Sequence, residues 1–307
     1  MKHLISLKDL TTEEIEEILH IGADLKEKYL RGLRETLFPG ATLGMIFQKQ
    51  SLRTRVSFEA AMTHLGGSAL YLADEIGFGK REPLSDFARV LSEMVDLVMI
   101  RAKHHEDVLE FAKYASIPVI NGLTDHCHPC QALADIFTLR EVADDIRGRK
   151  IAWVGDANNV ALSVATICGK LGLRFSVAVP EGYEFSPAVK EMLAREVPEL
   201  EMTETRDPAA AVRGALAVFT DVWVSMGQEE EKAVRERAFA AYQVNAELMA
   251  HTPDAYFMHC LPARRGYEVT DEVMESPRSL IIQEAGNRMH AQKGVLVWLL
   301  RNTWKSL

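Results

Sequence analysis

The first half of the chain alternates between amphipathic stretches and short apolar runs. A capping signature at 11–14 precedes apolar residues at helical spacing up to Leu30, which predicts a first helix. Short apolar runs with strand character follow, and helical stretches separate them. This alternation predicts βαβ units around a parallel sheet. The predicted strands are 42–47, 69–72, 97–100 and 118–120.

A second series of the same kind follows in the other half of the chain. A helix expected over 131–143 leads into a charged stretch at 144–149, which has the character of a hinge. We therefore expect a domain boundary near 130–150. The strands predicted in this series are 150–155, 175–179, 216–220, 255–259 and 279–283.

The two series predict an α/β fold with two doubly wound parallel-sheet domains, joined by interdomain helices and with an active site in the cleft between them. Residues 1–135 would form the first domain and residues 136–285 the second. The long periodic segment that starts at Glu284 would leave the second domain, so that 286–307 pack back on the first.

Composition narrows the class of protein. The chain has 307 residues, 48% hydrophobic and 26% charged, which is typical of a globular protein and not of a disordered one. Its 35 Lys and Arg against 44 Asp and Glu argue against a general nucleic-acid or anionic-membrane surface. No apolar run approaches the roughly 18 to 20 residues that cross a bilayer. Acidic residues stand where a secretory signal would be apolar. The four cysteines are too scattered for a disulfide framework. We expect a cytoplasmic protein.

The predicted strand 42–47 is followed by a polar loop and by Ser51-Leu52-Arg53-Thr54-Arg55, where an amphipathic helix begins. Such a junction presents free backbone N–H groups and the positive end of the helix dipole to an anion. Without the glycine-rich pattern of nucleotide loops, the anion should be small. Alternatively, Ser51 is only an N-cap and the arginines are solvated.

Ser51-Leu52-Arg53-Thr54-Arg55 resembles the carbamoyl-phosphate loop, usually Ser-Thr-Arg-Thr-Arg, of the aspartate and ornithine carbamoyltransferase family. Leu52 replaces a Thr that offers mainly its backbone N–H. Arg101, after a strand, and His128-Pro129-Cys130-Gln131 continue the resemblance. Alternatively, His126, Cys127, His128 and Cys130 form a metal site. A structural zinc site, however, normally draws ligands from a second pair of residues that is distant in the sequence.

Four segments of the second half resemble the same family. Three of them have an ordinary alternative: a dinucleotide turn at Gly155, which lacks G-x-G-x-x-G, a simple loop at the Ser-Met-Gly turn, and a buried apolar role for Cys260. The segment 221–227 reads Asp-x-Trp-x-Ser-Met-Gly and is similar to the segment that marks the ornithine enzymes of the family. The segments are Gly155-Asp156-Ala157-Asn158-Asn159, 221–227, His259-Cys260-Leu261-Pro262 and 284–293.

The resemblance implies a role for particular residues. Arg288 would complete the carbamoyl-phosphate pocket from the second domain. The catalytic residues would be Arg101, His128, Cys260 and Asp221. Carbamoyl phosphate would be bound by Ser51, Leu52, Arg53, Thr54, Arg101, His128, Gln131, Cys260, Leu261 and Arg288. Ornithine would be bound by Asn159, Asp221, Ser225 and Met226.

The implied reaction transfers the carbamoyl group from carbamoyl phosphate to the side-chain amine of L-ornithine and gives L-citrulline and phosphate. No metal or organic cofactor is implied, and the family assembles as trimers. The loop 74–82 lacks the Gln that family members often place there for the neighbouring subunit. Either Lys80 or backbone groups would take over its contact, or carbamoyl phosphate would be held with one fewer partner. Alternatively, Lys80 and Arg81 form only a solvated loop tip. The identity of the proton acceptor and the direction of flux, toward arginine or away from citrulline, stay open.

Three other functions compete with this one. A carbamoyltransferase for a related amine, such as putrescine or an acylated ornithine, is disfavoured by Asp221 and the Ser-Met-Gly turn. A nicotinamide-dependent oxidoreductase is disfavoured by the missing glycine fingerprint. A catalytically silent binding subunit is disfavoured because every residue type expected in the site is present.

Overall fold

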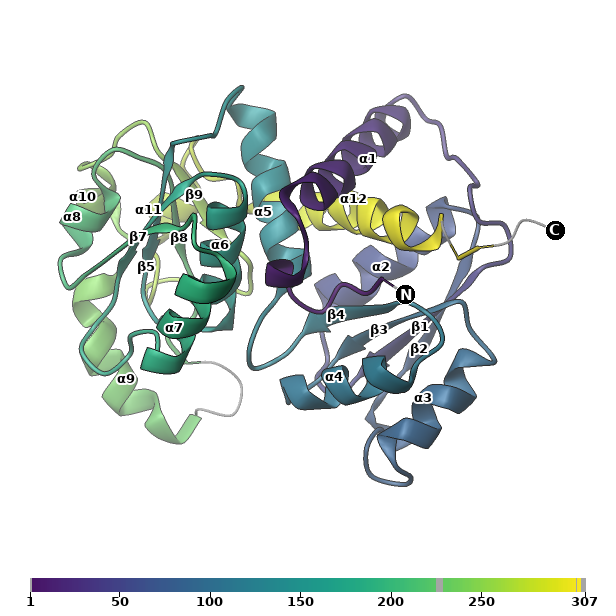
Figure 1. The fold of residues 1–307 in the computed structure, drawn as a ribbon. Coiled ribbons are helices and arrows are strands. Elements are labelled where there is room, and N and C mark those ends of the chain that lie inside the picture. The colour runs from purple at the N-terminus through teal and green to yellow at the C-terminus, as the bar shows by residue number, and fades with distance from the viewer. Residues whose placement is uncertain (1, 225–228, 302, 305–307) are drawn as a thin grey trace. The chain divides into compact units, whose positions relative to one another are not determined.

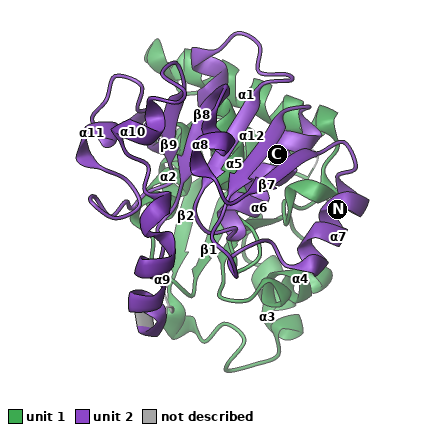
Figure 2. Ribbon diagram, turned by 90° about the vertical axis from the view of Figure 1, so that its left-hand side faces the viewer, with its two compact units in different colours: residues 1–137, 286–307 green, residues 138–285 purple. Residues whose placement is uncertain are grey.

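We describe the protein from a computed structural model of the chain (Figure 1). The structure describes residues 2–224, 229–301 and 303–304. These separate into two compact units, which Figure 2 shows in two colours. Unit 1 comprises 1–137 and 286–307, and unit 2 comprises 138–285.

Unit 1 is built on a parallel sheet with the strand order β2-β1-β3-β4. Leu4 adds an isolated parallel bridge to Ile120 at the edge of β4. The strands are β1 (Thr42–Phe47), β2 (Ser68–Leu72), β3 (Leu97–Arg101) and β4 (Val119–Leu123). The helices are α1 (Thr12–Leu30), α2 (Leu52–His64), α3 (Leu84–Ser92), α4 (His105–Tyr114), the start of α5 (Pro129–Val142) and most of α12 (Ile281–Leu300).

Helices cover both faces of this sheet. In Figure 1, α3 and α4 lie on one face, and α1 and α12 lie on the other. Apolar side chains of β1, β3 and β4 form a core with α3 and α4 that includes Val98, Ile100 and Phe111, all fully buried. Two glycines allow α1 and α12 to cross closely. A Cβ on Gly294 would lie 2.2 Å from the carbonyl oxygen of Ile18, and one on Gly22 would lie 2.9 Å from that of His290.

Unit 2 contains a parallel sheet with the order β7-β6-β5-β8-β9. Its core gathers Val154, Val218 and Phe257 from three strands and Phe239 from a helix. The strands are β5 (Lys150–Val154), β6 (Arg174–Ala178), β7 (Glu201–Thr205), β8 (Ala215–Thr220) and β9 (Tyr256–His259). The helices are the end of α5, α6 (Asn159–Lys170), α7 (Pro187–Glu196), α8 (Pro208–Val212), α9 (Lys232–Phe239), α10 (Ala246–Met249), α11 (Asp271–Met274) and the first turn of α12.

The predicted α/β class with two parallel sheets is confirmed, with one strand wrong and one missed. Residues 279–283 were expected to form a strand, but Ser279 makes only an isolated bridge to Phe257 and α12 begins at Ile281. The edge strand β7 was not predicted, because its polar residues hide the apolar pattern. The first helix is confirmed, with Thr11 and Glu14 forming a capping box. None of the described helices is long and apolar enough to span a membrane.

Candidate active site

The N-terminus of α2 is the centre of the candidate site in unit 1. Ser51 caps the helix, and its Oγ accepts the backbone N–H of Thr54 at 3.3 Å and contacts the Thr54 Oγ1 at 3.1 Å. Thr54 is fully buried. The positive end of the helix dipole and its free N–H groups therefore face a local cluster of hydroxyl groups.

Arg101 reaches this helix terminus because β1 and β3 are adjacent parallel strands. Their register pairs Phe47 with Arg101, so both strands end at the same edge of the sheet. The Arg101 carbonyl accepts the N–H of Gln48 at 2.9 Å, and its Nη1 lies 3.5 Å from Thr54 Oγ1. The side chain is buried. A buried guanidinium beside a helix N-terminus is suited to bind an anion.

Arg288 brings a second guanidinium to the same hydroxyl group. Its Nη2 donates to Thr54 Oγ1 at 2.9 Å, and its Nη1 donates to Gln131 Oε1 at 2.7 Å. The expectation that Arg288 joins the pocket from the second domain is wrong, because Arg288 lies in unit 1. The α12 helix leaves unit 2 after Ala285, so the residues from 286 onward fold with the N-terminal part of the chain.

His128 and Gln131 line the same cluster from the start of α5. Burial, reinforced by Arg288 and Arg101, holds the pKa of His128 well below its usual range, so the imidazole is neutral at pH 7. Its Nε2 lies 3.5 Å from the Arg288 Nη1. Gln131 Nε2 donates to Asp135 at 2.8 Å. Asp135 was not predicted, and it fixes the amide so that the Gln131 oxygen faces Arg288.

The two residues between Ser51 and Thr54 differ in their surroundings. Leu52 is exposed, which agrees with a role limited to its backbone. Arg53 is half-buried and has no carboxylate partner within the described residues. A guanidinium that no carboxylate neutralises keeps its full charge for a bound anion.

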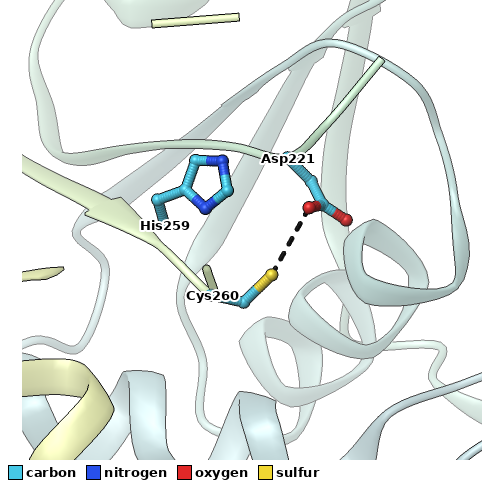
Figure 3. Close-up of side chains that lie close together, drawn as sticks. All are labelled: Asp221, His259 and Cys260. Atoms are coloured by element: carbon cyan, nitrogen blue, oxygen red, sulfur yellow. Dashed lines mark hydrogen bonds between the residues drawn. The ribbon is translucent and has the colours of Figure 1, made fainter. Parts of the chain in front are cut away.

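Unit 2 gathers a second polar cluster at the carboxyl ends of β5, β8 and β9. Figure 3 shows Cys260 pointing at Asp221, and the Cys260 thiol donates to Asp221 Oδ1 at 3.4 Å. On the other oxygen, Asp221 accepts the Asn158 amide at 2.8 Å. Asp221 and Cys260 lie close together because β8 and β9 are adjacent parallel strands, whose register pairs Thr220 with His259. Ligands of such sheets bind at this edge.

A buried pair behind Cys260 holds the chain after β9. His259 Nδ1 accepts the backbone N–H of Leu261 at 2.9 Å, so its proton lies on Nε2, which faces Glu268 at 3.3 Å. Both side chains of this pair are fully buried. Leu261 has a φ of 57°, a conformation that L residues rarely adopt. His259 and Glu268 therefore hold Cys260 and Leu261 in a strained turn, and neither role was predicted.

The other predicted ornithine residues are only partly described. Asn159 is the first residue of α6 and is half-buried, while Asn158 caps that helix through the N–H groups of Val160 and Ala161. Ser225 and Met226 lie outside the residues that the structure describes.

Metal-binding capacity is confined to unit 2 within the described ranges. The alternative site of His126, Cys127, His128 and Cys130 is not assembled, and burial raises the pKa of both of its thiols to about 12. Asp221, His259 and Cys260 do bring their ligand atoms within 4.8 Å of one another. However, both ring nitrogens of His259 already face protein partners, so a metal would have to displace one of them.

The loop 74–82 of unit 1 is exposed at Asp74 and Lys80, while Phe78 is buried in the core. Lys80 Nζ contacts both carboxylate oxygens of Asp74, at 2.9 and 3.0 Å, and its side chain is more than half exposed. Gly77 and Gly79 have positive φ angles and allow the tight turn. Within one chain, Lys80 is therefore available at the surface.

Comparison with known families identifies both halves of the chain. The model of the aspartate/ornithine carbamoyltransferase carbamoyl-P binding domain matches residues 2–141. The model of the aspartate/ornithine carbamoyltransferase Asp/Orn binding domain matches residues 147–299. The two matches together cover nearly the whole chain.

Individual relatives agree. An ornithine carbamoyltransferase of Methanopyrus kandleri is 51% identical over 304 residues, which cover 97% of each chain. One of Bacillus subtilis is 48% identical and covers 97% of this chain and 94% of that protein. The solved ornithine carbamoyltransferase of Pyrococcus furiosus superposes with a TM-score of 0.95 at 48% identity, covering 99% of this chain and 98% of that one. The chain therefore belongs to the aspartate/ornithine carbamoyltransferase family.

Proposed function

We propose that this chain transfers the carbamoyl group of carbamoyl phosphate to the side-chain amine of L-ornithine and releases L-citrulline and phosphate. The observation that carries the proposal is the convergence of Arg101 and Arg288 on Thr54 at the N-terminus of α2. Full-length relatives named ornithine carbamoyltransferase support the choice of substrates.

Unit 1 would bind carbamoyl phosphate. Ser51, Arg53, Thr54 and Arg101 would hold the phosphate, with the backbone N–H of Leu52 beside them. Attack on the carbamoyl carbon builds negative charge on the carbonyl oxygen and on the leaving phosphate. Preorganised cations and N–H donors stabilise such charge most where water is excluded. The burial of Arg101, Arg288 and Thr54 supports this role.

The carbamoyl group would be oriented by neutral donors. The pKa of His128 is lowered, so the imidazole stays neutral at the working pH. It can therefore donate an N–H to the carbonyl oxygen without a positive charge. Gln131, with its amide fixed by Asp135, and the backbone at Cys260 and Leu261 would hold the carbamoyl amide.

Unit 2 would bind ornithine at the cluster around Asp221. The Asp221 carboxylate would take the substrate's α-ammonium, and Asn159, Ser225 and Met226 would contact the rest of the amino acid. The attacking amine should titrate near 10.4, so neutralising it at pH 7.4 costs roughly 4 kcal/mol. Desolvation and a proton acceptor can offset this cost, and either Cys260 or the phosphate could accept the proton.

Two further features belong to the proposal. Closure around carbamoyl phosphate would create the site for ornithine, so carbamoyl phosphate should bind first. A homotrimer would cover an apolar face of unit 1, where Leu52 and Val56 lie one turn apart on α2 and Leu70 lies on the edge strand β2; all three are exposed. That face adjoins the phosphate site, so a neighbour's Lys80 could contact carbamoyl phosphate.

Incubation with carbamoyl phosphate and a panel of amines tests the activity. The panel contains ornithine, N-acetylornithine, putrescine and aspartate, and both phosphate and the carbamoylated product are measured. We expect citrulline from ornithine at a rate far above that with any other amine. Preferred carbamoylation of putrescine, N-acetylornithine or aspartate would contradict the proposed substrate. Light scattering tests the trimer, which should have three times the mass of the chain.

A further inference from the structure

Arg235 is a buried arginine of α9 that lies outside the predicted site. The residue is 4% exposed, and its guanidinium stacks over Tyr183 at 4.7 Å and Phe239 at 5.4 Å. Burying a guanidinium is unfavourable unless its donors are satisfied. The position of each donor therefore indicates what the side chain is built to hold.

Two donors of Arg235 hold segments that follow strands at the carboxyl edge of the sheet, while its Nη1 lies 3.4 Å from the exposed Glu231 carboxylate four residues earlier. Nε donates to the backbone carbonyl of Trp223 at 2.5 Å, and Nη2 forms an ion pair with Asp156. Asp156 follows β5 and Trp223 follows β8, and these strands are neighbours in the sheet. Tyr183, which the guanidinium covers, follows β6.

Both held segments lead directly to the candidate amino-acid site. Asn158 stands two residues after Asp156 and donates to Asp221 at 2.8 Å. Asp221 stands two residues before Trp223 and accepts the thiol of Cys260. A displacement of either segment would therefore separate Asn158 from Asp221, which is the group expected to take the substrate ammonium.

We propose that Arg235 is a positioning residue for the amino-acid substrate, because it fixes the Asp156 and Trp223 segments and thereby the geometry of Asp221. The inference rests on the proposed use of ornithine and deepens it. Burial raises the pKa of Asp156 and Arg235 opposes that shift, which agrees with a carboxylate that depends on this one cation. A planar fork matches a carboxylate and a carbonyl together, which an ammonium cannot do equally well.

Steady-state kinetics of Arg235→Lys, Arg235→Met and Asp156→Asn test the proposal, with thermal unfolding measured on each. We expect KM for ornithine to rise about tenfold or more in each variant while kcat stays within about threefold and KM for carbamoyl phosphate is unchanged. The double variant Arg235→Met/Asp156→Asn should show no larger KM than Arg235→Met alone, because the two act through one contact. If Arg235→Met fails to fold, Arg235→Lys and Asp156→Asn carry the test.

Arg237→Met is the matched control. Arg237 lies on the same helix, is exposed, and donates its Nε to the carbonyl of Ala233 at 3.1 Å. It should behave as wild type. An unchanged KM for ornithine in folded Arg235→Lys and Asp156→Asn would overturn the inference, as would a loss of Vmax with both KM values unchanged. Failure of the wild type itself to make citrulline would instead defeat the proposed function.

Discussion

Arg288 Nη2 donates a 2.9 Å hydrogen bond to Thr54 Oγ1 across 234 positions of sequence. The same hydroxyl oxygen lies 3.5 Å from the Arg101 Nη1 and 3.1 Å from the Ser51 Oγ. Three segments far apart in the chain, the helix α2, the strand β3 and the helix α12, therefore meet at one atom. Thr54 holds two buried guanidinium groups close together, and a bound anion would offset the repulsion between them.

Thr54→Val removes this shared hydroxyl group and keeps the shape of the side chain. The two guanidinium groups would lose their common acceptor and spread apart. We expect kcat/KM for carbamoyl phosphate to fall by about 10²–10³, as for the loss of one preorganised transition-state donor. Steady-state kinetics measure this, and Thr54→Ser, which keeps the hydroxyl group, should recover most of the activity.

Arg53→Ala removes the half-buried guanidinium that has no carboxylate partner within the described residues. We expect turnover to fall by several orders of magnitude while the melting temperature changes little, because no ion pair of the fold is lost. Arg89→Ala is the control, since Arg89 is exposed on α3, where it pairs with Asp86 at 3.2 Å and lies over the Tyr114 ring. Near-normal activity of Arg53→Ala would remove Arg53 from the site.

Glu268→Leu and Glu268→Gln separate geometry from charge behind Cys260. Glu268 Oε1 accepts both the Nε2 of His259 and the backbone N–H of Arg264, the latter at 2.5 Å. Leucine leaves the buried His259 Nε2 and the partly buried N–H of Arg264 without a partner, so we expect a loss of about 2–5 kcal/mol of unfolding free energy together with a lower kcat. Glutamine keeps an oxygen for both donors and should retain more of each. Equal effects of the two substitutions on chemical denaturation and kcat would contradict this role.

Because Lys293 is buried, we expect the free energy of unfolding to depend on pH between 8 and 10.5. The residue is almost fully buried on α12 beside the Tyr29 ring, at 4.8 Å, and burial together with Arg34 lowers its pKa from 10.5 to about 8. Unfolding restores the ordinary value. The charged form is therefore penalised in the folded protein at pH 7, and this penalty disappears as pH rises from 8 to 10.5.

Lys293→Met keeps the apolar stem without the charge. We expect it to raise the unfolding free energy at pH 7 by roughly 2–3 kcal/mol after the loss of the Tyr29 contact is subtracted, and to raise it much less at pH 10. Urea denaturation at both pH values measures the difference. The Lys28–Glu35 pair is the same in both proteins, and His64, whose pKa burial and Lys293 both lower, is uncharged at either pH. A stabilisation that does not change with pH would contradict the assignment to Lys293.

Much of the fold could be predicted because buried parallel strands are continuous apolar runs. The run 42–47 coincides with β1, and 97–100 with β3, since both strands are buried on both faces. The edge strand β7 has polar residues and gave no such signal, and the apolar residues after Ser279 begin a helix. Period alone does not separate these cases in short segments.

Less of the site could be predicted from the residues by themselves. Motif residues such as Ser51, Arg101 and Asp221 stand at strand ends or helix starts, where ligands bind. Asp135, Glu268 and Arg235 have no such local mark, because their roles come from partners that only the fold brings near. The segment 286–307 was expected to pack on the first domain, and Arg288 lies there, so the error was to assign its side chain to the second domain.

The proposed carbamoyl-phosphate site can be tested with a crystal structure of the protein bound to a bisubstrate analogue, in which a phosphonate is linked to ornithine. We expect the phosphonate at the N-terminus of α2, within hydrogen-bond distance of Ser51, Arg53 and Arg101, and the ornithine ammonium on Asp221. A phosphonate bound elsewhere, or guanidinium groups of Arg53 and Arg101 that face solvent in that complex, would contradict it.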